Sequence, residues 1–141
     1  MISFVGLGKL GLPLATCFAK NGVDILAIDK NKGLIDSLKE DKTPWLEARL
    51  SENIKKAKKH IKYTTSYDQV RSTSTTIILV NTPSNKTDGS FSNVYVEQTI
   101  ISICENLHPK KNKGHHFILS STVMPRTISK TLIPLIENIM P

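Results

Sequence analysis

The sequence predicts an α/β protein whose doubly wound parallel sheet lies between two layers of helices. Short apolar runs are separated by longer runs of helical periodicity, as in strands joined by crossover helices. The apolar runs do not alternate with polar residues, which is expected of strands covered on both faces. The first run leads directly into a turn with three glycines. The 141 residues fit a single domain of this kind.

Five strands and five helices are expected. The strands are expected at residues 2–5, 24–28, 61–64, 76–80 and 116–120, and the helices at 12–20, 33–40, 47–59, 93–106 and 127–139. Asn21 and Gly22 supply a left-handed stop for the first helix, and Ser92 is the expected N-cap of the fourth. The polar loop 84–90 follows the fourth strand, at the edge where ligands dock on open α/β sheets.

The number of strands is lower than usual for a fold that binds dinucleotides. Such folds commonly have six parallel strands, whereas only five precede Pro141. Residues 1–141 are therefore expected to form either a smaller sheet or the front part of a longer protein, without its final strand or strands. An unfinished apolar edge invites pairing with another chain, so a homo-oligomer is one expected partnership.

Composition indicates an ordinary globular protein, with 39% hydrophobic and 22% charged residues. No apolar run approaches the roughly 20 residues that span a bilayer. Glycines and Lys9 interrupt the N-terminal apolar stretch, which argues against a signal peptide and favours a cytoplasmic location. Cys17 and Cys104 lack the spacing of a metal or redox site and are expected to be reduced thiols within helices.

The net charge of +7 is concentrated in two lysine-rich segments, residues 55–62 and 110–113. A basic surface can attract nucleic acid or smaller anions. Apart from Tyr63, the first segment has no aromatic residue next to its lysines, so nucleic acid is not the expected partner. Solvated lysine faces that help to attract an anionic cofactor are the preferred interpretation.

The glycine turn has the form G-x-G-x-x-G, made by Gly6, Gly8 and Gly11. This pattern is weak alone, but here it follows an apolar strand and opens a helix, which is the Rossmann-type context. Gly6 permits the tight turn, Gly8 lets a pyrophosphate approach the backbone, and Gly11 lets the helix pack closely. The diphosphate is then expected on the free N–H groups of the turn, including those of Lys9 and Leu10.

Asp29 ends the second expected strand, 18 residues after Gly11. An acid at about this separation binds the hydroxyls of the adenosine ribose and repels a 2′-phosphate, which favours NAD over NADP. Lys30 and Lys32 follow and weaken that discrimination. The alternative is that the glycines serve packing alone and that Asp29 caps a helix.

Four segments together resemble the nucleotide-sugar 6-dehydrogenases, which include the UDP-glucose, UDP-N-acetylmannosamine and GDP-mannose dehydrogenases. The segments are GLGKLGLPLA, TPWLEARL, VNTPSNKTDGS and SSTVMPRT, in the family's order. The resemblance implies an NAD-binding domain over residues 1–141, with Thr82 and Thr122 lying along the cofactor. The alternative for both threonines is that they cap the turns that follow them.

The family's reaction is two successive NAD-dependent oxidations of a sugar C6 alcohol to a carboxylate through a cysteine. The resemblance places that cysteine, the central helix and the nucleotide-sugar domain beyond this segment, and neither Cys17 nor Cys104 matches the catalytic position. Residues 1–141 alone are thus expected to be inactive, and the nucleotide sugar is a partner of the full-length enzyme only.

Two positions depart from the family pattern. Arg126 stands where the family often has glycine, and Ser92 where many members have aspartate. Glu47 in TPWLEARL is given no role.

Two alternatives remain open. A β-hydroxyacid or 6-phosphogluconate dehydrogenase usually has methionine where this chain has Leu10, and lacks the TPWLEARL segment. A regulatory nucleotide-sensing domain of the same fold, as found on potassium channels, would bind NAD or ATP without catalysis but would not explain SSTVMPRT.

Overall fold

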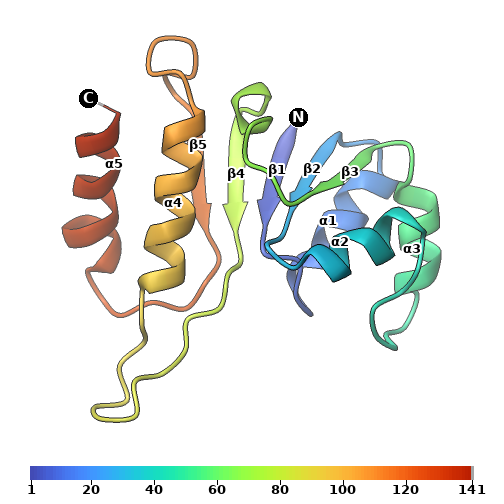
Figure 1. Ribbon diagram of the computed structural model, residues 1–141, viewed down its shortest axis with the longest axis horizontal. Helices are drawn as coiled ribbons and strands as arrows, with labels where there is room; N and C mark the ends of the chain where they lie inside the picture. Colours follow the sequence, from blue (N-terminus) through green and yellow to red (C-terminus); the bar gives the residue numbers. More distant parts are fainter. Residues whose placement is uncertain (141) are drawn as a thin grey trace.

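A five-stranded parallel sheet forms the centre of the computed structural model, which describes residues 1–140 (Figure 1). The strands are β1 (Ile2–Val5), β2 (Ile25–Ile28), β3 (Ile61–Thr64), β4 (Thr75–Ile78) and β5 (His116–Leu119), in the order β3-β2-β1-β4-β5. All neighbouring pairs are parallel. The predicted doubly wound sheet is confirmed. The winding direction reverses at β1, between β2 and β4.

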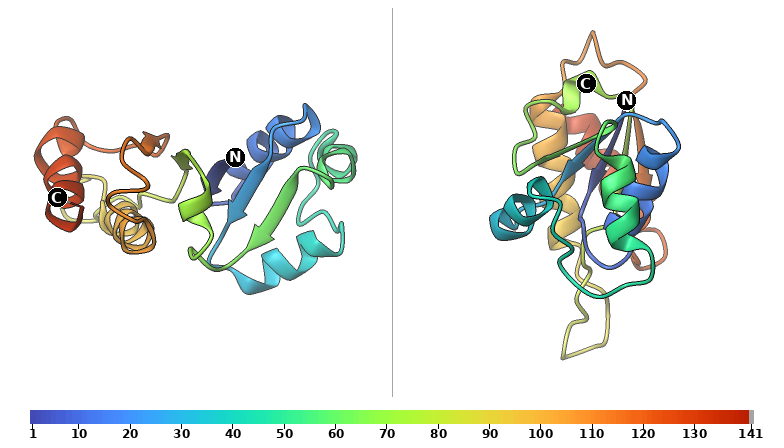
Figure 2. Two further views of the ribbon diagram at one scale, coloured as in Figure 1. Left: turned by 90° about the horizontal axis from the view of Figure 1, so that it is seen from above. Right: turned by 90° about the vertical axis from the view of Figure 1, so that its right-hand side faces the viewer.

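The helices cover both faces of the sheet (Figure 2). They are α1 (Gly11–Lys20), α2 (Lys32–Lys39), α3 (Leu50–Ala57), α4 (Val94–Asn106) and α5 (Ile133–Ile139), with a short 3-10 turn η1 (Val70–Ser72) and a π-helical turn η2 (Ile128–Leu132). Within residues 1–140, none of the helices has the length and apolar character needed to cross a membrane.

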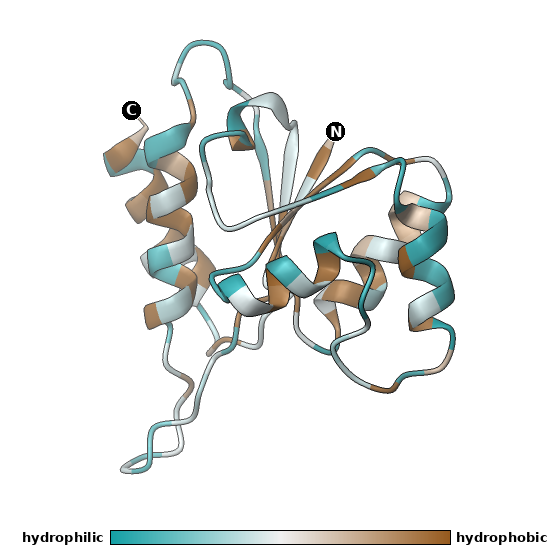
Figure 3. Cartoon of the chain, turned by 45° about the vertical axis from the view of Figure 1, so that its right-hand side comes forward, coloured by the Kyte–Doolittle hydropathy of each residue, from teal (hydrophilic) through white to brown (hydrophobic). Residues whose placement is uncertain are grey.

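Two hydrophobic clusters lie on opposite faces of the sheet because successive strand side chains point to opposite sides. Phe4 belongs to the cluster under α1 and α3, whereas the next residue, Val5, belongs to the cluster under α4. All four residues of β2 are buried. Apolar residues accordingly gather along the strands and the inner faces of the helices (Figure 3). The expected coverage on both faces is confirmed for the central strands, whereas the edge strand β5 is partly exposed, with Ile118 47% accessible.

Some predicted helix boundaries are wrong. The third helix begins at Leu50 and not at residue 47, because Arg49 has a left-handed φ of 63° and the backbone before it forms a loop. The single helix expected at 127–139 is divided into η2 and α5. Asn93, not Ser92, occupies the N-cap position of α4. The Ser92 hydroxyl lies 3.5 Å from the Val94 amide. Gly22 does end α1 with a φ of 88°.

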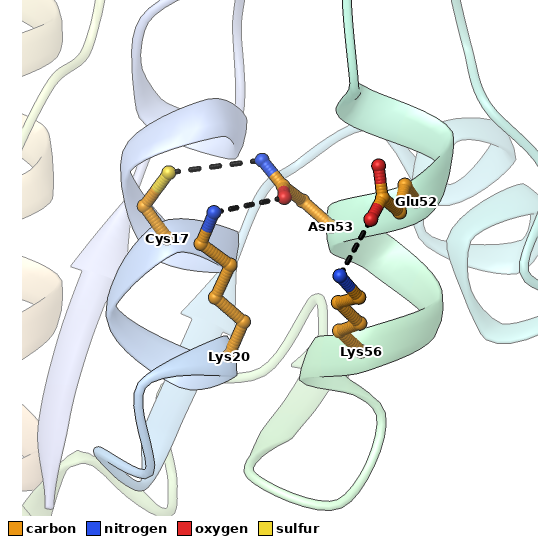
Figure 4. Close-up of polar contacts among 5 residues, drawn as sticks. All are labelled: Cys17, Lys20, Glu52, Asn53 and Lys56. Atoms are coloured by element: carbon orange, nitrogen blue, oxygen red, sulfur yellow. Dashed lines mark hydrogen bonds and ion pairs between the residues drawn. The ribbon is translucent and has the colours of Figure 1, made fainter.

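The lysine-rich segment 55–62 is partly neutralised on the surface. Lys56 pairs with Glu52 at 2.5 Å along α3, and Lys58 pairs with Asp41. On the side of α3 that faces α1, Asn53 accepts a hydrogen bond from Lys20 at 3.1 Å and donates one to the Cys17 sulfur at 3.8 Å (Figure 4). Asn53 thus faces α1, whereas the lysines of segment 55–62 are all exposed, in line with the interpretation as a solvated face.

A network of hydroxyl groups and one histidine links β1, β4 and the residue before β5, near the amino ends of these strands. Ser3 in β1 bonds to the Thr76 hydroxyl at 2.6 Å, and that hydroxyl lies 2.8 Å from Nε2 of His115. The other ring nitrogen of His115 lies 3.1 Å from the Thr73 carbonyl, which places the proton on Nδ1 and makes Nε2 an acceptor. Burial lowers the pKa of His115, although the Thr73 carbonyl opposes this effect. The network therefore favours neutral histidine.

We expect His115 to destabilise the fold in mild acid. Because its folded-state pKa lies below the ordinary value of about 6.5, the unfolded chain binds a proton first as the pH falls. The contribution of neutral His115 to the free energy of unfolding is fully present above its ordinary pKa. It is lost as the pH falls from that value through the lower pKa of the folded state. Urea unfolding between neutral pH and mild acid should show a smaller fall in the free energy of unfolding for His115→Gln than for the unmodified protein. Parallel pH profiles would contradict this assignment.

The turn after β5 contains a residue in a conformation that favours glycine. Arg126 has a φ of 71°, and its carbonyl accepts the hydrogen bond that starts η2, from the Lys130 amide at 2.9 Å. A left-handed residue therefore stands at the position where the family pattern often has glycine.

Replacing Arg126 by glycine should stabilise the protein by about 0.5–1 kcal/mol, since the relieved backbone strain exceeds the added freedom of the unfolded chain. Thermal unfolding would measure the gain. Arg126→Ala is the matched control and should show no gain, because it keeps a Cβ atom in the same backbone conformation.

Candidate functional site

A cavity of about 500 Å³ opens at the carboxyl ends of β1, β2 and β4. It lies at the point where the winding of the sheet reverses, which is the usual ligand site of open α/β sheets. Its wall comes from the turn after β1, the loop after β2, the end of β4 and α4, and also from α2 and the loops that follow α2 and β3. The lining includes Gly6, Leu7, Gly8, Asp29, Lys30, Leu34, Trp45, Tyr67 and Tyr95.

The turn after β1 is shaped by two glycines that cannot carry a side chain. Gly6 has a φ of 94°, and a Cβ atom on it would lie 2.6 Å from the Leu79 carbonyl oxygen at the end of β4. A Cβ atom on Gly11 would lie 1.8 Å from the Gly6 carbonyl oxygen. The role predicted for Gly6 in the tight turn is confirmed. Gly11 also has no room for a side chain, but its close contact is with the turn itself and not with the strands.

Gly8 differs from both. A Cβ atom on Gly8 would meet nothing within 4 Å, and Gly8 lines the cavity. The fold itself therefore has no steric need for glycine here. An additional side chain would instead extend into the open space that a ligand would use.

The start of α1 is open to an anion. No side chain caps it, and no acidic residue lies in its first turn. Within residues 1–140, the backbone N–H groups of Gly8, Lys9 and Leu10 donate no hydrogen bond. Unpaired amides at the positive end of a helix dipole bind phosphate groups. Gly8 lines the cavity, and Lys9, Leu10 and Gly11 continue the turn just outside it.

Asp29 is fixed at the rim of the cavity by two backbone amides. Its Oδ2 accepts a hydrogen bond from Leu7 at 2.7 Å, and its Oδ1 accepts one from Asn31 at 2.8 Å. The Leu7 amide is thus occupied by the acid, so not every amide of the turn is free. Each carboxylate oxygen keeps a further lone pair for a ligand hydroxyl.

The rest of the cavity wall is largely apolar and aromatic. Leu34, Trp45, Tyr67 and Tyr95 come from four separate segments, and burial raises the pKa of Tyr67, which keeps its phenol neutral. The indole of Trp45 donates to Glu47 at 2.9 Å, which gives Glu47 a contact that the sequence did not suggest. The sequence indicated none of these four as site residues. Trp45 lies in the TPWLEARL segment, but it comes together with Leu34, Tyr67 and Tyr95 only in the folded chain.

Two lysines beside Asp29 have their ammonium groups engaged elsewhere. The Lys30 ammonium lies 4.3 Å from the centre of the Tyr95 ring, and Lys32 pairs with Asp36 at 2.6 Å. Lys30 lines the cavity and Lys32 does not.

The two threonines named above lie away from the cavity. Thr82 is half-buried and Thr122 is exposed, and neither contributes to its wall. Their segments are nevertheless neighbours, since the Ser121 hydroxyl donates to the Val80 carbonyl at 2.7 Å. Thr82 leads into the loop 84–90, which a bridge between Ser84 and Phe91 closes.

Neither cysteine lines the cavity. Cys104 is buried in α4, where burial raises the pKa of its thiol to about 11, and Cys17 faces α3. Within the described part of the chain, no group of three or more histidine, cysteine or acidic residues could hold a metal ion.

The donor set fits a dinucleotide. Free amides at the start of α1 suit a diphosphate, the Asp29 carboxylate suits a ribose diol, and the aromatic wall suits a base.

Comparison with known proteins gives a consistent family. Residues 1–140 match the model of the "UDP-glucose/GDP-mannose dehydrogenase family, NAD binding domain". A UDP-glucose 6-dehydrogenase of Haloferax volcanii is 32% identical over 138 residues, which are 97% of this chain and 32% of that relative.

Solved structures agree. A ternary complex of GDP-mannose dehydrogenase from Pseudomonas aeruginosa superposes with a TM-score of 0.91 at 29% identity, over 99% of this chain and 32% of that one. A UDP-N-acetyl-mannosamine dehydrogenase of Staphylococcus aureus gives a TM-score of 0.88 at 33% identity, over 98% and 32%. The chain therefore spans about a third of the length of these relatives.

The three glycines should respond differently to alanine. Gly11→Ala and Gly6→Ala should destabilise the protein by about 2–4 kcal/mol, because their Cβ atoms meet backbone that cannot move freely. Gly8→Ala should change stability by less than about 0.5 kcal/mol. It should still weaken NADH binding about 10-fold or more, because the methyl group enters the ligand space.

Thermal unfolding and calorimetric titration with NADH would separate the two effects. An alanine at position 8 that binds NADH like the unmodified protein would contradict the placement of the diphosphate.

Proposed function

Because the chain belongs to the UDP-glucose/GDP-mannose dehydrogenase family, as its NAD-binding domain, we propose that NAD binds across the carboxyl edge of its sheet in a defined orientation. The diphosphate lies on the turn from Gly6 to Gly11, where the Gly8, Lys9 and Leu10 amides supply the hydrogen bonds. The observation that carries this proposal is that the Gly8 amide, followed by those of Lys9 and Leu10 at the cavity edge, lies at the same cavity as the fixed Asp29 carboxylate.

The adenosine half occupies the cavity in this proposal. Asp29 accepts hydrogen bonds from the ribose hydroxyls, while the adenine lies against the apolar wall that includes Leu34 and Tyr67. Lys30 contributes positive charge at the same rim. The rigid hold on Asp29 supports this assignment, since an acceptor fixed by backbone amides loses little freedom when a ligand binds.

The nicotinamide half extends past the ends of β4 and β5 toward Thr82 and Thr122. Their position outside the cavity fits this arrangement, because the cavity is filled by the other half of the cofactor. The hydroxyls can bond to the second ribose without adding charge to a site that already holds a diphosphate.

We further propose that residues 1–141 form the N-terminal cofactor domain of a longer enzyme that oxidises the C6 alcohol of a nucleotide sugar to a carboxylate. The bound NAD accepts the hydride in each of the two oxidations. The relatives named above support this class of reaction. Neither Cys17, turned toward α3, nor Cys104, buried with a raised pKa, is suited to act as the nucleophile. That role belongs to a residue outside this domain.

The sugar is not chosen by this domain. Relatives named for UDP-glucose, GDP-mannose and UDP-N-acetylmannosamine all match it to a similar degree.

We place the protein in the cytoplasm, consistent with its two free cysteines. The edge strand β5, whose Ile118 is 47% exposed, is where a further strand or a second subunit would pair.

Asp29→Asn should weaken NADH binding about 10-fold or more, because a charged acceptor for the ribose hydroxyls is lost. Asp24→Asn is the matched control. Asp24 lies just before the amino end of β2, at the other end of the strand from Asp29, and pairs with His60 at 2.9 Å. Calorimetric titration of the full-length protein with NADH measures both. Equal affinities for the Asp29 variant and the unmodified protein would refute the ribose assignment.

A further inference from the structure

We propose that Tyr95 raises the preference of this site for NAD over NADP by holding the Lys30 ammonium over its ring. In this position the ammonium is withheld from the place that a 2′-phosphate would occupy. The inference rests on the proposed binding of the adenosine ribose at Asp29.

The geometry around Lys30 is unusual for a lysine that follows an acid. Its ammonium lies 4.3 Å from the Tyr95 ring centre, within the range of a cation–π contact. Within residues 1–140 it lies within 4 Å of no carboxylate oxygen, including those of the adjacent Asp29. Tyr95 stands in the first turn of α4, so the contact links the loop after β2 to the helix that follows β4.

A free lysine ammonium at this rim would favour binding of NADP over NAD. NADP differs from NAD by a phosphate on the adenosine ribose, and sites that accept NADP place a basic side chain near that phosphate. Lys30 follows the acid directly and lines the same cavity, so it is the residue best placed for such a contact. The next lysine, Lys32, is already paired with Asp36 along α2.

Asp29 cannot relieve the conflict by moving. The Leu7 amide holds Oδ2 and the Asn31 amide holds Oδ1. The carboxylate therefore stays beside the ribose and repels a 2′-phosphate. The discrimination against NADP is strongest when Lys30 does not neutralise the Asp29 carboxylate. The Tyr95 ring supplies an alternative position for the Lys30 ammonium.

The expected size of the effect follows from the strength of the contact. A partly exposed cation–π interaction favours the held position by about 2- to 5-fold. Removing the ring should therefore reduce the ratio of the NADPH dissociation constant to the NADH dissociation constant by about 2- to 5-fold. The ratio isolates the charge effect, because any contact of the ring with adenine is common to both cofactors.

The test measures this ratio by calorimetric titration of the full-length protein with NADH and NADPH. Tyr95→Leu should lower the ratio. Tyr95→Phe keeps the ring and should preserve the ratio of the unmodified protein. In a Lys30→Met background, Tyr95→Leu should have no effect on the ratio, because the cation that the ring holds is absent.

Two results would overturn the inference. One is an unchanged ratio in Tyr95→Leu, and the other is a fall that persists in the Lys30→Met background. If NADH binds normally while the ratio behaves in either of these ways, only the role of Tyr95 is lost. If NADH fails to bind the unmodified protein, the cofactor site itself is wrong and the inference falls with it.

Discussion

The close passage of the backbone between β1 and α1 is the constraint on which the rest of this site depends. A side chain on Gly11 would overlap the carbonyl of Gly6, and one on Gly6 would overlap that of Leu79. The turn can therefore bring the start of α1 to the edge of the sheet only where these side chains are missing. The amides of Gly8, Lys9 and Leu10 have no hydrogen-bond acceptor among residues 1–140, and no side chain caps the start of α1.

Asp29 couples this turn to the second strand. Its carboxylate accepts the Leu7 amide from the turn and the Asn31 amide from the start of its own loop. One charged group thus fixes the glycine turn relative to the loop after β2, where we propose that the diphosphate and the ribose bind. The two lysines that follow Asp29 are engaged, Lys32 with Asp36 and Lys30 with the Tyr95 ring.

The sequence was sufficient for the parts of the fold that depend on local patterns. Strand β1, the glycine turn, α1 and Asp29 follow one another within 29 residues, so each could be recognised in the context of the others. The aromatic wall was not recognised because Trp45, Tyr67 and Tyr95 meet only after the sheet forms. The start of α3 was misplaced because Arg49 adopts a left-handed backbone that nothing in its side chain requires. The positions of Thr82 and Thr122 relative to the cofactor follow from the resemblance and not from the cavity.

A crystal structure of the protein with bound NAD is the most direct test of this account. The diphosphate oxygens should lie within hydrogen-bonding distance of the Lys9 and Leu10 amides, with the adenosine ribose hydroxyls on Asp29. A diphosphate held instead by lysine side chains on the surface of α3, with the start of α1 left open, would contradict the central claim.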